Sequence, residues 1–349
     1  MNRSGTMLAH LKKTALRSEK VIIALHIVDE WKARRRLRVG DVAETSGSTH
    51  SDMDLSASLD YIERVFRDYL DYGGFSKRDL QGVRILEIGP GDNFGVALKF
   101  IAAGAGKVVC LDRFYSKRDP AQQRSIYQAM RASLPDPERE RFDQAITFTR
   151  DGAEVAPERI RYLYGFGIEE AARFLSDGCF DLMISRAVLE HFYDSDKALE
   201  VMDRLLAPGG RHLHKVDFTD HKMFSGNGLH PLTFLTIRDE VYRLMSRDTG
   251  GPNRRLIDFY RSKLRGLGYE FSLLKTHVFG AQADIVPHEE NLSRGTDYTE
   301  ETLALLRQVR PRLLPRYRNL SDEVSGVFIV ARKPEAGGAE AAGSGAALP

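Results

Sequence analysis

A strand, a glycine loop and a helix follow one another between residues 83 and 104. The largely apolar run Val83 to Ile88 predicts a buried strand, which carries an acid, Glu87, near its end. Gly89 and Gly91 allow a sharp turn and a close approach of the backbone to a ligand. Apolar residues between 96 and 103 predict a helix that ends at a glycine. This order is typical of the first unit of a nucleotide-binding α/β fold.

The same alternation of apolar runs and helical stretches continues to about Lys333. Because helical sequence separates most of the runs, we expect a mainly parallel sheet. The further strands are predicted at 107–111, 146–149, 180–185 and 211–216, followed by two late strands at 270–274 and 326–331. One apolar stripe (Leu55, Leu59, Ile62, Phe66, Tyr69) predicts a helix that covers the ligand pocket or packs on the sheet.

Composition is that of an ordinary globular protein. The 349 residues are 42% hydrophobic and 29% charged, with a net charge of only +2, which speaks against a strong polyanion binder. Two separated cysteines, Cys110 and Cys179, form neither a disulfide framework nor a zinc motif and fit a reducing cytoplasm. No apolar run approaches the roughly 20 residues that span a bilayer.

The first 40 residues differ from the rest, with ten Lys or Arg against three acids. This basic segment is expected either to touch an acidic membrane or nucleic acid surface, weakly, or to be a solvated helix that packs Ile22, Ile23 and Trp31 on the domain. The expected domains are a basic helical arm and linker (1–53), a catalytic domain (54–333) and a low-complexity, disordered tail (334–349). Within the catalytic domain, 54–81 is the covering helix, and 217–269 and 276–323 are insertions over the pocket.

The glycine loop departs from a dinucleotide fingerprint, because Phe94 stands at its third glycine position. The stretch Glu87, Gly89, Gly91, Asn93 instead resembles the first motif of the class I S-adenosylmethionine (SAM)-dependent methyltransferases, with Asn93 in place of a third glycine. Three further blocks resemble that family in the same order: Asp112; Asp151-Gly152-Ala153; and Ser185-Arg186-Ala187-Val188-Leu189-Glu190-His191 with Pro208-Gly209-Gly210. The resemblance covers roughly residues 82 to 216.

The resemblance implies a Rossmann-like sheet of seven mostly parallel strands with helices on both faces, a last strand that is antiparallel, and added N-terminal helices. It implies SAM as the cofactor. The carboxylate of Asp112 would accept hydrogen bonds from the ribose diol. The other cofactor-binding residues it implies are Glu87, Gly89, Gly91, Asn93, Arg113, Asp151, Gly152, Ala153, Ser185 and Arg186.

Candidate catalytic groups follow the fourth and fifth strands, where parallel sheets bind substrates. His191, Asp217, His221 and His230 are the candidates for proton transfer if the acceptor is a hydroxyl or a protonated amine. His212 and His214 lie within the fifth strand and are expected to be hydrogen-bonded core residues. No cluster of Asp, Glu and His has the sequence spacing of a metal site.

The range of acceptor classes is narrowed mainly by motifs that the sequence lacks. The chain lacks the Pro-Pro motif of DNA-amine methyltransferases, the Pro-Cys pair of cytosine-C5 enzymes and a recognisable RNA-binding module. A small-molecule hydroxyl or amine is therefore favoured, and family habit suggests a sugar or a secondary metabolite. The alternatives are a macromolecular or membrane-associated acceptor reached through the basic arm, a non-catalytic SAM-fold protein, and an NAD(P)-dependent oxidoreductase, against which Phe94 speaks. The oligomeric state is left open.

Overall fold

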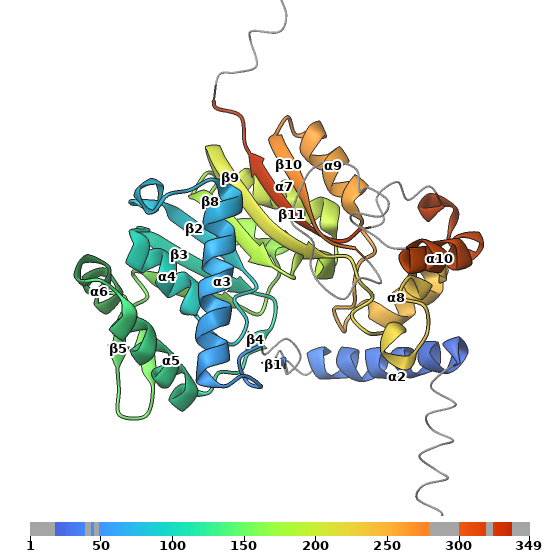
Figure 1. Ribbon diagram of the computed structural model, residues 1–349, viewed down its shortest axis with the longest axis horizontal. Helices are drawn as coiled ribbons and strands as arrows, with labels where there is room; N and C mark the ends of the chain where they lie inside the picture. Colours follow the sequence, from blue (N-terminus) through green and yellow to red (C-terminus); the bar gives the residue numbers. More distant parts are fainter. Residues whose placement is uncertain (1–17, 39–42, 45–48, 279–299, 319–323, 337–349) are drawn as a thin grey trace, which may run out of the picture.

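A seven-stranded sheet forms the centre of the molecule (Figure 1). The computed structural model describes residues 18–38, 43–44, 49–278, 300–318 and 324–336. The strands are β1 (Ala43–Glu44), β2 (Arg84–Ile88), β3 (Lys107–Asp112), β4 (Tyr115–Ser116), β5 (Ile146–Phe148), β6 (Ala153–Val155), β7 (Ile160–Tyr164), β8 (Phe180–Arg186), β9 (Leu206–Asp217), β10 (Glu270–Val278) and β11 (Val324–Arg332).

The order of strands in the large sheet is β10-β11-β9-β8-β2-β3-β7. The pairs from β9 to β7 are parallel, whereas β11 runs antiparallel to both β9 and β10. The predicted Rossmann-like, mostly parallel sheet with a reversed last strand is thus confirmed. Because parallel strands share a direction, the carboxyl ends of β2, β3, β7 and β8 lie at one edge of the sheet.

Helices cover both faces of this sheet, with α3 to α6 on one face and α7 and α9 on the other. The helices of the described residues are α2 (Glu19–Arg38), α3 (Leu55–Gly73), α4 (Gly95–Ala103), α5 (Pro120–Ser133), α6 (Asp136–Asp143), α7 (Ser195–Leu205), α8 (Asp239–Ser246), α9 (Ile257–Gly266) and α10 (Glu300–Val309). Polar N-caps start several of them: the side chain of Asp54 accepts a hydrogen bond from Ala57 N of α3, and Asp119 does the same for α5. Gly104 ends α4, as the sequence predicts.

Successive side chains of a strand point to opposite faces of the sheet, so each strand contributes to two separate hydrophobic cores. In β2, Ile85 packs with α3, α4 and α5 on one face, and Leu86 packs with α7 and α9 on the other. Figure 1 shows α3 running across the sheet. The helix predicted from the apolar stripe is confirmed as α3, and Ile62, Phe66 and Tyr69 of that stripe are buried on the sheet side.

The third strand of the sheet is not the one predicted. Ile146–Phe148 pairs antiparallel with Ala153–Val155 in a hairpin outside the main sheet, and β7 takes the edge position beside β3. The intervening Asp151-Gly152 forms the turn, in which Gly152 N donates to Thr149 Oγ1. A connection this short favours a hairpin, because a crossover between parallel strands needs a dozen or more residues. The turn at Asp151-Gly152 was therefore a signal against the predicted parallel strand.

The N-terminal helix α2 docks on α8, at the end of the molecule where α10 also lies (Figure 1). Ile22 is buried in a third hydrophobic cluster with Tyr242 and Leu306. Packing of Ile22 and Ile23 is as expected, but Trp31 is 61% exposed, so the prediction that it packs on the domain is wrong.

Several predicted segments fall partly or wholly outside the described residues. These are residues 1–17 of the basic arm, 279–299 and 319–323 of the second insertion, and 337–349 of the tail. Within the described part of the chain, no helix combines the length and the apolar character needed to cross a membrane.

The core around α4 should carry much of the stability. Phe100 is 1% exposed and contacts Phe66 with ring centroids 5.0 Å apart. We predict that Phe100→Ala lowers the free energy of unfolding by about 3–5 kcal/mol, because it leaves a cavity. The exposed Phe174→Ala is the matched control and should cost about 1 kcal/mol or less. Urea unfolding measures both, and equal losses in the two variants would contradict the packing described.

Candidate active site

A cavity of about 550 Å³ opens at the carboxyl ends of the parallel strands. Its floor is formed by the residues that follow β2, β3, β7 and β8. Its walls include Tyr61 and Tyr69 of α3, His50 from the segment before α3, and Thr249 and Gly250 from the loop after α8. Pieces far apart in the sequence therefore enclose one pocket of the size that binds a small ligand.

The glycine loop after β2 needs its glycines. Gly89 and Gly91 have φ angles of 73° and 68°, in the left-handed region. A Cβ on Gly89 would also lie 2.3 Å from Cγ2 of Val188. The loop is fixed to the next strand, because Gly89 N donates to Leu111 O at 2.8 Å. These two glycines thus bring bare backbone to the cavity, as predicted.

Two carboxyl groups with unusual pKa values line the cavity. Burial raises the pKa of Glu87, at the end of β2, to about 7, and only the Sγ of Cys110 donates a hydrogen bond to it, at 3.4 Å. Burial also raises the pKa of Asp112, at the end of β3, to about 6, although Ser116 Oγ donates to it. Neither carboxyl group has an ion-pair partner among the described residues. A cationic or hydroxyl-rich ligand would supply the missing partner.

Asn93 and its neighbour Asp92 tie the glycine loop to the chain before α3. Asn93 Oδ1 accepts from Gly95 N, while its Nδ2 is buried without a hydrogen-bond partner. The carboxylate of Asp92 accepts from the backbone N–H groups of His50 and Ser51. Neither Asp92 nor His50 was predicted as a site residue. The segment before α3 has the composition of a linker, and its contacts with Asp92 join residues 41 and 42 positions apart in the sequence.

The residues after β7 complete the cavity, in place of those predicted. Asp151, Gly152 and Ala153 lie in the β5–β6 hairpin and are not among the described residues that line the cavity, so the geometry does not support their predicted place beside the ligand. The cavity is lined instead by Gly167, Ile168 and Glu169. The available signal was a glycine and an acid just after the aromatic run of β7.

Arg113 borders this part of the cavity. Its guanidinium pairs with Glu169 at 2.6 Å and lies 4.0 Å from the ring centroid of Tyr193. A Cβ on Gly167 would lie 2.0 Å from the Arg113 side chain, so this glycine lets the arginine pass. The arginine, predicted from its place after Asp112, does line the cavity.

Ser185 and Arg186, at the end of β8, both line the cavity as predicted. Ser185 Oγ is hydrogen-bonded to His214 Nδ1 at 2.7 Å, and His214 is bonded in turn to His212. Both histidines are buried, which confirms the prediction of core residues. Arg186 forms a partly buried ion pair with Asp68 of α3 at 2.6 Å and so ties the covering helix to the sheet.

Of the four candidate catalytic groups, the structure brings three together. His191 and His221 line the cavity, and Asp217 Oδ2 lies 3.9 Å from His221 Nε2 without itself lining the cavity. His230 is elsewhere: its Nδ1 accepts from Leu232 N within a turn, and it does not line the cavity. The candidate role of His230 therefore has no support in the geometry.

A loop held by the N-terminal helix orients His191. The imidazole Nδ1 is hydrogen-bonded to Gly250 O at 2.6 Å. Glu30 of α2, which is 2% exposed, accepts hydrogen bonds from the backbone of Asp248 and Thr249. The basic arm thus shapes one wall of the cavity, a function that its charge pattern did not reveal.

Comparison with known proteins agrees with this geometry. A family model described as a methyltransferase domain matches residues 59–250. No curated protein matches the sequence significantly.

Among solved structures, the chain is similar to a phosphoethanolamine N-methyltransferase 2 of Haemonchus contortus in complex with SAM (16% identity, TM-score 0.40, 78% of this chain and 53% of that one). It is also similar to a putative SAM-dependent methyltransferase of Listeria monocytogenes (16% identity, TM-score 0.39, 80% of this chain and 99% of that one). A third similar structure is that of the [4+2]-cyclase SpnF (15% identity, TM-score 0.40, 78% of this chain and 82% of that one). The chain spans about half the length of the Haemonchus enzyme. Similarities of this degree carry no information about the substrate.

The family match covers more than half of the chain, from the covering helix to the loop at Gly250. It includes the glycine loop, both buried carboxyl groups, His191 and His221. The chain therefore belongs to the methyltransferase-domain family.

Proposed function

We propose that the chain transfers the methyl group of SAM to a hydroxyl or amine of a small-molecule acceptor. The observation that supports this choice is the cavity of about 550 Å³, whose walls include α3, His50 and the Thr249-Gly250 loop. A pocket assembled in this way admits a cofactor and a compact acceptor, and it excludes the water that would compete for the methyl group. A polymer would need an open groove beside the cofactor.

The two buried carboxyl groups would hold opposite ends of the cofactor. Asp112 would accept hydrogen bonds from the ribose hydroxyls, since an ionised carboxylate offers acceptors for a diol. Glu87, at the glycine loop, would face the positively charged methionine end. The adenine would lie against Gly167 and Ile168, which line the cavity next to Asp112.

The remaining predicted residues have supporting roles in this arrangement. Asn93 has a buried, unpartnered amide nitrogen at the glycine loop. Arg113 borders the adenine side, whereas Ser185 and Arg186 lie towards α3 and the acceptor side.

Methyl transfer itself is an in-line displacement at carbon. A lone pair of the acceptor oxygen or nitrogen forms the new bond, and the electrons of the carbon–sulfur bond return to sulfur. The proton of the acceptor leaves in the same step or just after it. Positioning contributes most of the rate acceleration that the protein can supply. His191 and His221 line the cavity where the acceptor would lie, and Asp217 stands behind His221, with Oδ2 3.9 Å from Nε2.

A macromolecular or membrane-associated acceptor is the second candidate, and one feature of α2 favours it. Leu25, Val28 and Trp31 are exposed at intervals of three residues, and the guanidinium of Arg35 lies 5.9 Å from the Trp31 ring centroid. An exposed apolar edge next to basic groups suits an anionic surface.

A product search separates the two candidates. The full chain is incubated with methyl-labelled SAM and cell extract, and the extract is then divided into macromolecular and small-molecule fractions. We expect enzyme-dependent label in the small-molecule fraction. Label confined to protein, nucleic acid or lipid would contradict the proposal, and so would the absence of any labelled product.

Asp112 gives a direct prediction for cofactor binding. Asp112→Ala should weaken SAM binding at least about tenfold, because the ribose diol loses its acceptor and a charge-assisted hydrogen bond contributes about 1.5–3 kcal/mol. Isothermal titration calorimetry measures this loss. Asp177→Ala removes an exposed carboxylate from the surface ion pair with Arg204 and is the matched control, which should bind as the wild type does. Unchanged affinity in Asp112→Ala would remove this residue from the site.

The raised pKa values predict a pH dependence of SAM affinity. Both carboxyl groups bind in their charged forms, which are lost as the pH falls through about 7 for Glu87 and about 6 for Asp112. Affinity should therefore be highest above pH 7 and fall on acidification, by up to about tenfold per pH unit for each proton taken up. Glu87→Gln should bind more weakly at high pH and lose the step near pH 7. A wild-type affinity that is constant from pH 8 to pH 5 would refute the assignment.

A further inference from the structure

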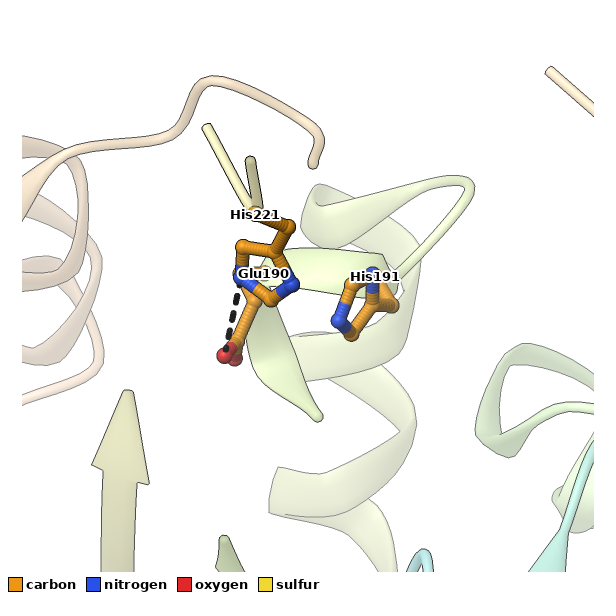
Figure 2. Close-up of side chains that lie close together, drawn as sticks. All are labelled: Glu190, His191 and His221. Carbon is orange, nitrogen blue, oxygen red and sulfur yellow. Dashed lines mark ion pairs between the residues drawn. The ribbon is translucent and has the colours of Figure 1, made fainter. Parts of the chain in front are cut away.

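Three side chains of the kinds that bind metal ions lie together at the cavity: His191 and His221, which line it, and the buried Glu190 beside them. Glu190 and His191 belong to the short 3-10 helix after β8, and His221 lies on the loop after β9; Figure 2 shows the three side chains close together. One possible ligand atom from each lies within 4.8 Å of the others. The two imidazole rings are 4.7 Å apart between centroids and nearly perpendicular, at 89°. Sequence spacing did not reveal this group, because β9 separates its members.

Glu190 is a buried carboxyl group with an incomplete set of partners. Its side chain is 2% exposed, and Oε1 accepts a hydrogen bond from Asp217 N at 3.1 Å. Oε2 is buried, and no group among the described residues makes a hydrogen bond to it. The approach to His221 Nε2, at 3.9 Å, is too long for a hydrogen bond. Because a buried oxygen without a partner is costly, the geometry calls for a cation at this point.

His191 already has the orientation of a metal ligand. Gly250 O can only accept a hydrogen bond, so the Nδ1 atom 2.6 Å away carries the hydrogen. Nε2 of the neutral ring therefore offers its lone pair. Metal-binding histidines are commonly oriented by such a hydrogen bond from the opposite ring nitrogen to a carbonyl. The carbonyl is itself positioned, because Glu30 holds the backbone of the two preceding residues.

His221 can complete the group from the exposed side. Its φ angle is 48°, and its Nε2 lies 3.9 Å from both Glu190 Oε1 and Asp217 Oδ2. Ligands on neighbouring sides of a metal ion lie about 3 Å apart when each bond is about 2.0–2.2 Å long. The group must therefore contract on binding. The side chain of His221, which is 29% exposed on a loop, is the member free enough to make that movement.

We propose that Glu190, His191 and His221 bind a divalent transition-metal ion, with Asp217 available as a further carboxylate, and that the ion binds the acceptor oxygen. Two imidazoles and one carboxylate suit Zn²⁺, Fe²⁺ or Mn²⁺, whereas Mg²⁺ prefers an all-oxygen set. This inference rests on the proposed function, because it takes the acceptor of the methyl group to be a hydroxyl compound.

The ion would act as a Lewis acid on that hydroxyl. A bound hydroxyl has a lowered pKa and gives up its proton to solvent. The oxygen then forms the bond to the methyl carbon while the carbon–sulfur bond breaks and sulfur keeps the electron pair. The products are the methyl ether, S-adenosylhomocysteine and one proton.

Metal titration of the full chain tests the site without an activity measurement. After removal of bound metals with a chelator, calorimetric titration with Zn²⁺ and with Mn²⁺ should show one site. His221→Ala and Glu190→Gln should each weaken it at least about tenfold. His26→Ala removes a histidine of α2 outside the group and should bind metal as the wild type does. S-adenosylhomocysteine binding and thermal unfolding confirm that each variant is folded.

Co²⁺ provides a second readout on the wild type alone. Nitrogen ligation should give visible absorption bands that saturate at one equivalent and that Zn²⁺ abolishes. The proposal is overturned if the wild type binds none of these ions more tightly than about 1 mM, if Co²⁺ gives no such bands, or if His221→Ala and Glu190→Gln bind as the wild type does. A chain that binds metal at this site but labels only macromolecules would keep the metal site and refute the proposed acceptor.

Discussion

The burial of two carboxyl groups, which desolvation penalises more than their hydrogen bonds compensate, is the constraint on which the site depends. Parallel pairing of β2 with β3 places Glu87 and Asp112 at adjacent strand ends, and the covering helix α3 shields the cavity from water. Desolvation raises both pKa values, so the charged forms of the two groups are costly at this edge of the sheet. A ligand with a positive charge at one end and a diol at the other relieves both costs. SAM has this distribution, and the glycine loop lets it approach.

Local patterns predicted those parts of the fold that local chemistry decides. The glycine loop, the helix ended by Gly104 and the carboxylates at strand ends depend on residues close in sequence, and the structure has them as expected. The number of strands, their mostly parallel direction and the reversed last strand followed from the family resemblance. The prediction of the third strand was wrong because an apolar run such as Ile146–Phe148 can form either a hairpin strand or a parallel strand of the sheet. Which of the two it forms depends on the strand with which it pairs.

The walls of the cavity could not be predicted in the same way, because they depend on contacts between distant segments. His50 reaches the glycine loop through Asp92, and Glu30 of a basic helix holds the loop that orients His191. The charge pattern left open whether that helix touches an acidic surface or packs on the domain, and it did not indicate the structural function of the buried acid Glu30. The grouping of Glu190 with His191 and His221 likewise appears only when the ends of β8 and β9 are brought together.

A crystal structure of the full chain with S-adenosylhomocysteine would test the central claim most directly. The account predicts the ribose hydroxyls within hydrogen-bond distance of the Asp112 carboxylate, the adenine against Gly167 and Ile168, and the amino-acid end at the glycine loop near Glu87. A ligand bound outside this cavity, or with its ribose away from Asp112, would contradict it.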